Sequence, residues 1–190
     1  YQAFSSPRIS YCSPRYTGSG SGTDGRVSDS SKAAAFVSDS GSVSGSSVTV
    51  GGIVGQTQTS ATIENCSFSG NVTSAYTGTK GATAGVGGIV GKVNAGTLTV
   101  TNCANHATVT ATNGCPGGIV GYAGSNKITI SNGYNDGTIS GQYYPSGICG
   151  TNTNNKTAST ITNCYNAGSI SNGAGISANF KTNTGSVTSC

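Results

Sequence analysis

The 190-residue chain is poor in charge and rich in glycine: 7% of its residues are charged, 31 are glycines, and the net charge at pH 7 is +4. It has one leucine and one glutamate, so it lacks the residues that stabilise helices, and a helical bundle is excluded. Its lysines and arginines are scattered, which argues against a nucleic-acid partner. Its apolar runs are far shorter than the roughly 20 residues of a membrane-spanning helix.

The first 50 residues form a less regular segment than the rest. Residues 17–47 are rich in glycine and serine and have the composition of a linker. The apolar run at residues 33–37 favours instead a cap over the first coil of the following unit, and docking on a neighbouring subunit is a third interpretation. We therefore expect an N-terminal cap or arm over residues 1–50 and a folded unit over residues 51–190.

Residues 51–190 repeat a short pattern. The sequence Gly-Gly-Ile-Val-Gly begins at Gly51, Gly87 and Gly117 and returns in weaker form at Ser146 and Ala174, with steps of 36, 30, 29 and 28 residues. A second block, best preserved as Thr-Ile-x-Asn-Cys, and a third block ending in Val/Ile-Ser/Thr follow in each cycle. Short β-branched blocks separated by glycine and asparagine are typical of strands. Three such strands in about 30 residues predict an all-β fold, a parallel β-solenoid of about five coils.

In a solenoid, matching residues of successive coils lie above one another. The aliphatic residues of the second block should then point inward, and the hydroxyl residues beside them outward. The expected inward column is Ile63, Val100, Ile130, Ile161 and Val187. The asparagines after this block should form a ladder of side-chain amides that satisfies backbone groups of the turn. They are Asn65, Asn102, Asn132 and Asn163.

Seven cysteines accompany a single histidine and few carboxylates, which favours disulfides over a metal site. Neighbouring coils lie ~4.8 Å apart and disulfide Cα atoms prefer ~5.5–6 Å, so cysteines at one repeat phase are nearly in bonding position. The predicted pairs are Cys66 with Cys103, Cys164 with Cys190 and, near the Gly-Gly corner, Cys115 with Cys149. Cys12 is then left over, either free or bonded to another subunit. We expect no metal and no cofactor.

Three Asn-x-Ser/Thr sequons, at Asn65, Asn71 and Asn155, are candidate glycosylation sites. Together with the cysteines they favour a secreted or cell-surface protein.

Residues 161–171 read Ile-Thr-Asn-Cys-Tyr-Asn-Ala-Gly-Ser-Ile-Ser and follow a block with Ile148, Cys149 and Gly150. This pattern resembles the GLUG repeat, and the resemblance extends over about residues 51–190. GLUG repeats occur in many secreted adhesins and surface proteins, and in some peptidases as non-catalytic modules. The resemblance implies a β-solenoid and an extracellular setting, and it brings no catalytic residues with it.

Residues that could carry chemistry do not recur at one phase. His106 lies in a turn close after Cys103, but matching positions in other coils hold other residues, so a solvated turn histidine is the favoured interpretation over a Cys/His pair. The carboxylates share no repeat phase, which argues against a glycan-cleaving site and against calcium-binding repeats. They are Asp24, Asp29, Asp39, Glu64 and Asp136. We expect no catalytic residues and no enzymatic activity.

The favoured function is that of a secreted structural or adhesive protein that associates head to tail into a filament and binds a glycan or a cell-surface ligand. Tyr122, Tyr134, Tyr165 and the pair Tyr143 and Tyr144 are candidates for glycan stacking, with stacking between coils as the simpler interpretation. The alternative function is ice binding through outward columns of threonine. That face would consist of Thr62, Thr99, Thr101, Thr129, Thr160, Thr162 and Thr188.

Overall fold

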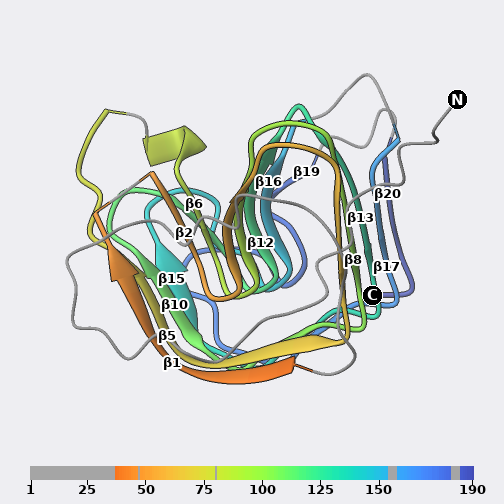
Figure 1. Ribbon diagram of the computed structural model, residues 1–190, viewed down its shortest axis with the longest axis horizontal. Helices are drawn as coiled ribbons and strands as arrows, with labels where there is room; N and C mark the ends of the chain where they lie inside the picture. Colours follow the sequence, from red (N-terminus) through yellow and green to blue (C-terminus); the bar gives the residue numbers. More distant parts are fainter. Residues whose placement is uncertain (1–36, 47, 80, 154–157, 181–184) are drawn as a thin grey trace, which may run out of the picture.

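The computed structural model describes residues 37–46, 48–79, 81–153, 158–180 and 185–190. Within them the chain winds into a solenoid whose coils lie over one another (Figure 1). The described residues form strands apart from loops, turns and one short 3-10 turn at Gly81–Thr83. Strands of successive coils pair in parallel, as in Lys127–Ser131 against Thr97–Thr101. The parallel β-solenoid predicted from the repeats is therefore confirmed.

Four sheets form the walls, numbered here in the order in which the chain meets them. Sheet I contains β2 (Thr49–Gly51), β6 (Gly85–Gly87) and β11 (Cys115–Gly117). Sheet II contains β3 (Val54–Thr57), β7 (Val90–Val93), β12 (Val120–Gly124), β16 (Cys149–Asn152) and β19 (Asn179–Phe180). Sheet III contains β4 (Ala61–Glu64), β8 (Thr97–Thr101), β13 (Lys127–Ser131), β17 (Thr160–Thr162) and β20 (Ser186–Thr188). Sheet IV contains β1 (Val37–Gly45), β5 (Cys66–Ser74), β9 (Ala104–Asn105), β10 (Thr108–Ala111), β14 (Tyr134–Asn135), β15 (Ile139–Gly141) and β18 (Tyr165–Asn166).

The isoleucines of the Gly-Gly-Ile-Val-Gly blocks fix the stacking of the coils. The backbone N–H of Ile53 donates to the carbonyl of Ile89 over 3.1 Å, and that of Ile89 donates to Ile119 over 3.3 Å. The same bond continues from Ile119 to Ile148 and from Ile148 to Ile176. Like positions of five successive blocks therefore lie directly over one another, as the repeat predicts.

The aliphatic column of sheet III fills the interior for four of its five members. Ile63, Val100, Ile130 and Ile161 are fully buried. Val187, the fifth, is 40% exposed, so its predicted burial is wrong. Its strand β20 pairs with β17, and no other described strand pairs with it to cover Val187.

Strand β1 lies within the segment expected as a cap or arm. It pairs with β5 over nine register positions, from Val37 opposite Cys66 to Gly45 opposite Ser74, and so lies beside the first coil at the edge of sheet IV (Figure 1). The other part of that expected segment, residues 1–36 with Cys12, lies outside the described residues.

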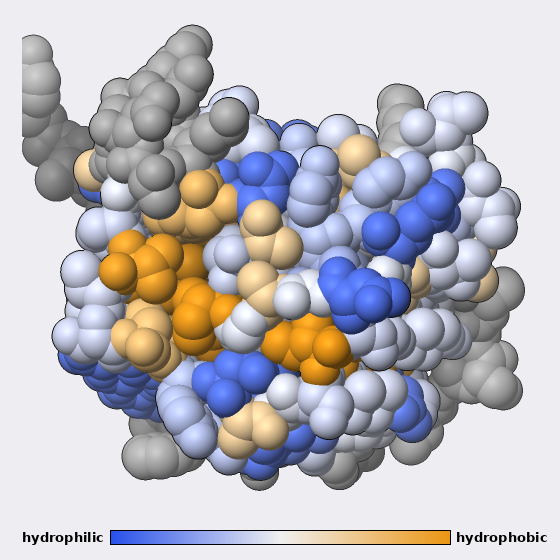
Figure 2. All heavy atoms as spheres, turned by 180° about the vertical axis from the view of Figure 1, so that it is seen from behind, coloured by the Kyte–Doolittle hydropathy of each residue, from blue (hydrophilic) through white to orange (hydrophobic). Residues whose placement is uncertain are grey.

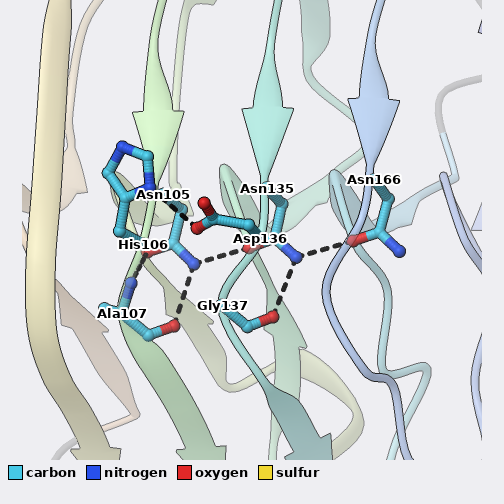
Figure 3. Close-up of polar contacts among 7 residues, drawn as sticks. All are labelled: Asn105, His106, Ala107, Asn135, Asp136, Gly137 and Asn166. Atoms are coloured by element: carbon cyan, nitrogen blue, oxygen red, sulfur yellow. Dashed lines mark hydrogen bonds and ion pairs between the residues drawn. The ribbon is translucent and has the colours of Figure 1, made fainter.

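A second asparagine ladder runs inside the solenoid and was not predicted. Asn105 Nδ2 donates to Asn135 Oδ1 over 2.6 Å, and Asn135 Nδ2 donates to Asn166 Oδ1 over 2.6 Å (Figure 3). Each of the three also donates to the carbonyl two residues later, as Asn135 does to Gly137 over 3.1 Å. Asn105 and Asn135 are fully buried. These bonds satisfy amide groups that would otherwise destabilise the interior.

The second glycine of each Gly-Gly pair makes room for this ladder. A Cβ at Gly118 would lie 2.6 Å from Asn135 Oδ1, and one at Gly88 would collide with Asn105 Oδ1. In the first coil the matching residue is Phe68 instead of asparagine, and a Cβ at Gly52 would lie 2.6 Å from its ring. The glycine is therefore required by a close approach of a side chain.

Candidate functional surfaces

The outer face of sheet III carries two columns of hydroxyl groups, which we call the hydroxyl wall. One column runs through Thr62, Thr99, Thr129, Thr160 and Ser186. The other runs through Glu64, Thr101, Ser131, Thr162 and Thr188. Neighbouring coils exchange hydroxyl contacts along the second column, at 3.2 Å between Thr101 and Ser131 and 3.3 Å between Thr188 and Thr162. All seven threonines of the expected ice-binding face lie on this wall, in register.

The hydroxyl wall is interrupted on its margins. Glu64 takes the place of a hydroxyl residue in the first coil, opposite Thr101. The exposed Lys127 lies opposite Thr97 beside the two columns. The regular part of the wall therefore spans the second to the last described coil.

The outer asparagine ladder follows sheet III at the corner to sheet IV. Asn102 Nδ2 donates to Asn65 Oδ1 over 3.1 Å, and Asn132 Nδ2 donates to Asn102 Oδ1 over 2.9 Å. These asparagines and Asn163 have φ between 53° and 56°, a left-handed conformation that asparagine tolerates better than most residues. The predicted ladder is thus present from Asn65 to Asn132, and Asn163 repeats its backbone conformation.

Four residues on the turn and strand after this corner form a surface cluster, which we call the aromatic cluster: His106, Tyr134, Asp136 and Tyr165. The rings of Tyr134 and Tyr165 stack, with centroids 5.9 Å apart and planes 11° from parallel. His106 meets Tyr134 edge to face at 6.0 Å. Tyr165 is 62% exposed, the most exposed large apolar side chain that the structure describes. The stacking between coils expected for Tyr134 and Tyr165 is present, and it leaves an aromatic surface open to solvent.

His106 and Asp136 form a pair across two coils. His106 Nδ1 lies 2.7 Å from Asp136 Oδ1, and the two side chains are 41% and 40% exposed (Figure 3). Desolvation raises the pKa of the Tyr134 hydroxyl, and the negative charge of Asp136 raises it further. Cys103 is buried and its Sγ donates to the carbonyl of Thr101 over 3.3 Å. The contacts of His106 therefore run to Asp136 and Tyr134, in keeping with a surface turn histidine.

The other candidate tyrosines lie elsewhere on the chain. Tyr122 on β12 carries the Lys92 ammonium 5.2 Å from its ring centre. Tyr143 and Tyr144 lie in the loop between β15 and β16, with tilted rings 6.5 Å apart. Within the described part of the chain, the ring contacts of the aromatic cluster join His106 to Tyr134 and Tyr134 to Tyr165.

Four cysteines stand in one column at the start of sheet IV. Ser67 pairs with Ala104, and Tyr134 pairs with Ala104 and Tyr165, so the residues one position earlier, Cys66, Cys103, Gly133 and Cys164, lie at one level of successive coils. Cys190 continues this column, two residues after Thr188, which pairs with Thr162. The six described cysteines are thiols in this structure. The neighbouring thiol of Cys103 lowers the pKa of Cys66, whereas the proximity of Cys66, together with burial, raises the pKa of Cys103.

Cys115 and Cys149 do not share a register position. Cys115 lies opposite Gly85 in sheet I, whereas Cys149 lies opposite Val120 in sheet II. Both are fully buried. Burial raises the pKa of Cys115 to about 11 and that of Cys149 to about 12, so both remain protonated at neutral pH.

The described carboxylates form no shared site. Glu64 lies on the hydroxyl wall and Asp136 in the aromatic cluster, Asp39 belongs to β1, and Asp24 and Asp29 lie outside the described residues. Within the described part of the chain, no group of three or more His, Cys, Asp or Glu side chains could hold a metal ion. No helix in that same part is long and apolar enough to span a membrane.

The candidate glycosylation sites differ in their surroundings. Asn65 is half-buried and accepts a hydrogen bond from Asn102, so its side chain is part of the outer ladder. Asn71 is exposed on β5, between Ser42 and Thr108 of the neighbouring strands. Asn155 lies outside the described residues.

One copy of the repeat matches a known protein family. Residues 46–73, which span β2 to β4 and most of β5, match the family model of the GLUG motif. This chain carries a GLUG repeat. No curated protein and no solved structure matches it at a significant level.

The register of the coils extends the GLUG pattern beyond the matched residues. Its glycines approach side chains or backbone of the next coil, and its turn asparagine takes the left-handed conformation. The inner asparagine, three residues after the turn asparagine, is the feature that sequence reasoning missed. Its signal was present as the spacing Asn-x-x-Asn at residues 102–105, 132–135 and 163–166.

Proposed function

We propose that this GLUG-repeat chain is a secreted, non-enzymatic structural or adhesive module that contacts a glycan through its aromatic cluster. The observation that carries the proposal is the exposed ring of Tyr165, held by stacking on Tyr134. Carbohydrate rings present apolar C–H faces that pack on aromatic rings, while their hydroxyls need hydrogen-bond partners. Asp136 and His106 supply partly exposed polar atoms beside these rings.

Rigidity supports binding at this surface. The cluster sits directly above the buried asparagine ladder, since Tyr134 and Tyr165 immediately precede Asn135 and Asn166. Little conformational entropy is then lost when a ligand orders these side chains, so more of the contact energy is retained as affinity.

The experiment compares two tyrosine variants in binding to a panel of immobilised oligosaccharides. Tyr165→Ala is expected to weaken binding about tenfold or more, because it removes the exposed ring. Tyr144→Ala serves as the matched control, because Tyr144 is also exposed, at 39%, and lies outside the cluster. Equal binding by both variants, or no binding of the wild type to any glycan, would overturn the proposal.

Head-to-tail self-association is the second part of the proposal. Apolar side chains gather in the middle of the face seen in Figure 2. In the last described coil, Val187 is exposed, and Ile170, Ile176 and Phe180 are only partly buried. A coil of a second copy would cover them and pair with β20. Light scattering over a concentration series tests this self-association, which should raise the average mass with concentration. A constant monomer mass up to high concentration would exclude it.

Ice binding is a second candidate function, favoured by the register of the hydroxyl wall. Two columns of Thr and Ser repeat at the coil spacing over four successive coils, which gives a regular array of hydroxyl and methyl groups. Thermal hysteresis measurements test it. Thr129→Lys, in the middle of the wall, is expected to abolish hysteresis, and Thr108→Lys on sheet IV should leave it unchanged. Absence of hysteresis in the wild type would exclude this function.

A further inference from the structure

The cysteine column offers an inference that is independent of the proposed function. Three of its sulfurs, those of Cys103, Cys164 and Cys190, share one orientation and point toward the preceding coil. The Sγ of Cys103 approaches the carbonyl of Ile63 at 3.8 Å, that of Cys164 approaches Ile130 at 3.8 Å, and that of Cys190 approaches Ile161 at 3.7 Å. Each of these carbonyls belongs to the preceding coil. Ile63, Ile130 and Ile161 lie three residues before Cys66, Gly133 and Cys164, the members of the column in those coils.

This orientation aims two sulfurs at a coil that carries a cysteine in the column and one at a coil that carries a glycine there. The Sγ of Cys103 is aimed at the coil that carries Cys66. The Sγ of Cys190 is aimed at Cys164, whose backbone N–H lies 3.3 Å from it. Cys164 points toward Gly133, whose N–H lies 3.3 Å from Cys164 Sγ and which has no side chain to meet it. The column is therefore divided into two pairs.

We propose that the two pairs are modification sites, oxidised to inter-coil disulfides between Cys66 and Cys103 and between Cys164 and Cys190, while Cys115 and Cys149 stay as thiols. Adjacent positions on parallel strands lie ~4.8 Å apart, within the 4.4–6.8 Å range of disulfide Cα separations. The bonds tie the first coil to the second and the last described coil to the one before it.

Each pair contains one accessible sulfur and one buried sulfur. Cys66 is half-buried and Cys190 is exposed, whereas Cys103 and Cys164 are buried. The thiolate of the accessible cysteine attacks a small disulfide such as oxidised glutathione, forms a mixed disulfide and releases one glutathione thiolate. The buried partner, deprotonated, then attacks the protein sulfur of the mixed disulfide and releases the second glutathione. The two protons of the cysteines end on the two glutathione thiols, so atoms and electrons balance.

The test incubates the reduced, folded chain with oxidised and reduced glutathione at pH 8, alkylates the remaining thiols, and maps the bonds after non-reducing digestion with trypsin. Cleavage after the lysines places Cys66 in residues 33–80, Cys164 in residues 157–181 and Cys190 in residues 182–190. Cys103 and Cys115 share residues 93–127, so a Cys115→Ser variant distinguishes them. The expected products join residues 33–80 to 93–127, also in that variant, and residues 157–181 to 182–190.

Other products would overturn the proposal. Joining of residues 33–80 to 157–181, loss of the first product in Cys115→Ser, or full alkylation of the folded chain without bonds would each do so. A second measurement uses the accessible cysteines, whose replacement leaves the interior intact. Reductant should lower the melting temperature of the oxidised wild type by on the order of 10 °C. It should have no effect on the Cys66→Ser/Cys190→Ser double variant, and an equal drop in both proteins would contradict the assignment.

Discussion

Asn135 is the central residue of the inner ladder, and both of its neighbours depend on it. It accepts a hydrogen bond from Asn105 and donates one to Asn166, within an interior that water does not reach. A polar side chain at this position of a strand would ordinarily be assigned to the outer face, because alternation and polarity both point there. The ladder reverses that assignment, since three stacked amides satisfy one another.

Asn135→Ala is expected to lower the free energy of unfolding by about 2–3 kcal/mol, because it leaves amide groups of both neighbours without their partner. Asn132→Gly is the matched control: it removes an amide from the exposed outer ladder and keeps a residue suited to a φ of 53°. That variant should change stability by less than about 1 kcal/mol. Urea unfolding of both variants measures the difference, and equal losses would contradict a special role of the inner ladder.

The buried thiols predict a loss of stability at alkaline pH under reducing conditions. The folded chain keeps the proton of Cys149 until its pKa of about 12, whereas the unfolded chain loses it near the ordinary value of 9.0. Between these values the unfolded state releases a proton that the folded state retains, so stability falls as pH rises. From pH 8 to 10.5 the wild type should lose about 2 kcal/mol more than a Cys149→Ala variant. If the free energy of unfolding fell equally with pH in the wild type and in Cys149→Ala, Cys149 would ionise as readily in the folded chain as in the unfolded chain.

At the scale of the strand and its turn, the GLUG repeat combines three local requirements. A Gly-Gly pair allows close approach, an aliphatic residue fills the interior, and a turn asparagine takes the left-handed conformation. Each requirement recurs at one phase, so the coils and their register could be predicted from the sequence. Strand β1 could not, because Val37–Gly45 is rich in serine and glycine and its pairing with β5 involves no repeated signal.

Gly88→Ala tests the close approach. The added methyl group would collide with Asn105 Oδ1 and with the carbonyl of Gly118, so both the ladder and the backbone of the next coil must shift. We expect a loss of about 1–3 kcal/mol in the free energy of unfolding. Gly175→Ala is the control, because a Cβ there meets nothing within 4 Å. A thermal or urea unfolding series with both variants decides, and a Gly88→Ala protein as stable as the control would show that the coil can widen freely.

At the scale of the whole molecule, each coil contacts only its neighbours, so stability should vary along the axis. The column of isoleucines from Ile53 to Ile176 is buried in its middle members and partly exposed at both ends. Sequence reasoning placed Val187 in the same environment as Ile161, because periodicity gives the phase of a residue and carries no information on which coil is covered. Exposure at the ends follows from position along the axis.

Hydrogen exchange should follow this gradient. The amides of Ile89 and Ile119, which bond to the next coil in the middle of the stack, are expected to be the most protected. Amides of β19 and β20 should exchange much faster in the reduced chain, because fewer neighbours hold the last coil. Exchange followed by mass spectrometry measures both regions, and uniform protection along the chain would indicate that the solenoid opens only as one unit.

The absence of a side chain at Gly133 also limits the ways in which the chain can misfold. Because successive coils are nearly identical, a coil can pair with the wrong neighbour, one coil away from its native partner. An unbroken column of cysteines would trap this misalignment through a disulfide. With Gly133 in the column, a displacement of either end by one coil brings a sulfur opposite glycine, where nothing can trap it. A coil misaligned in this way is not cross-linked, so it can separate and pair again in the native register.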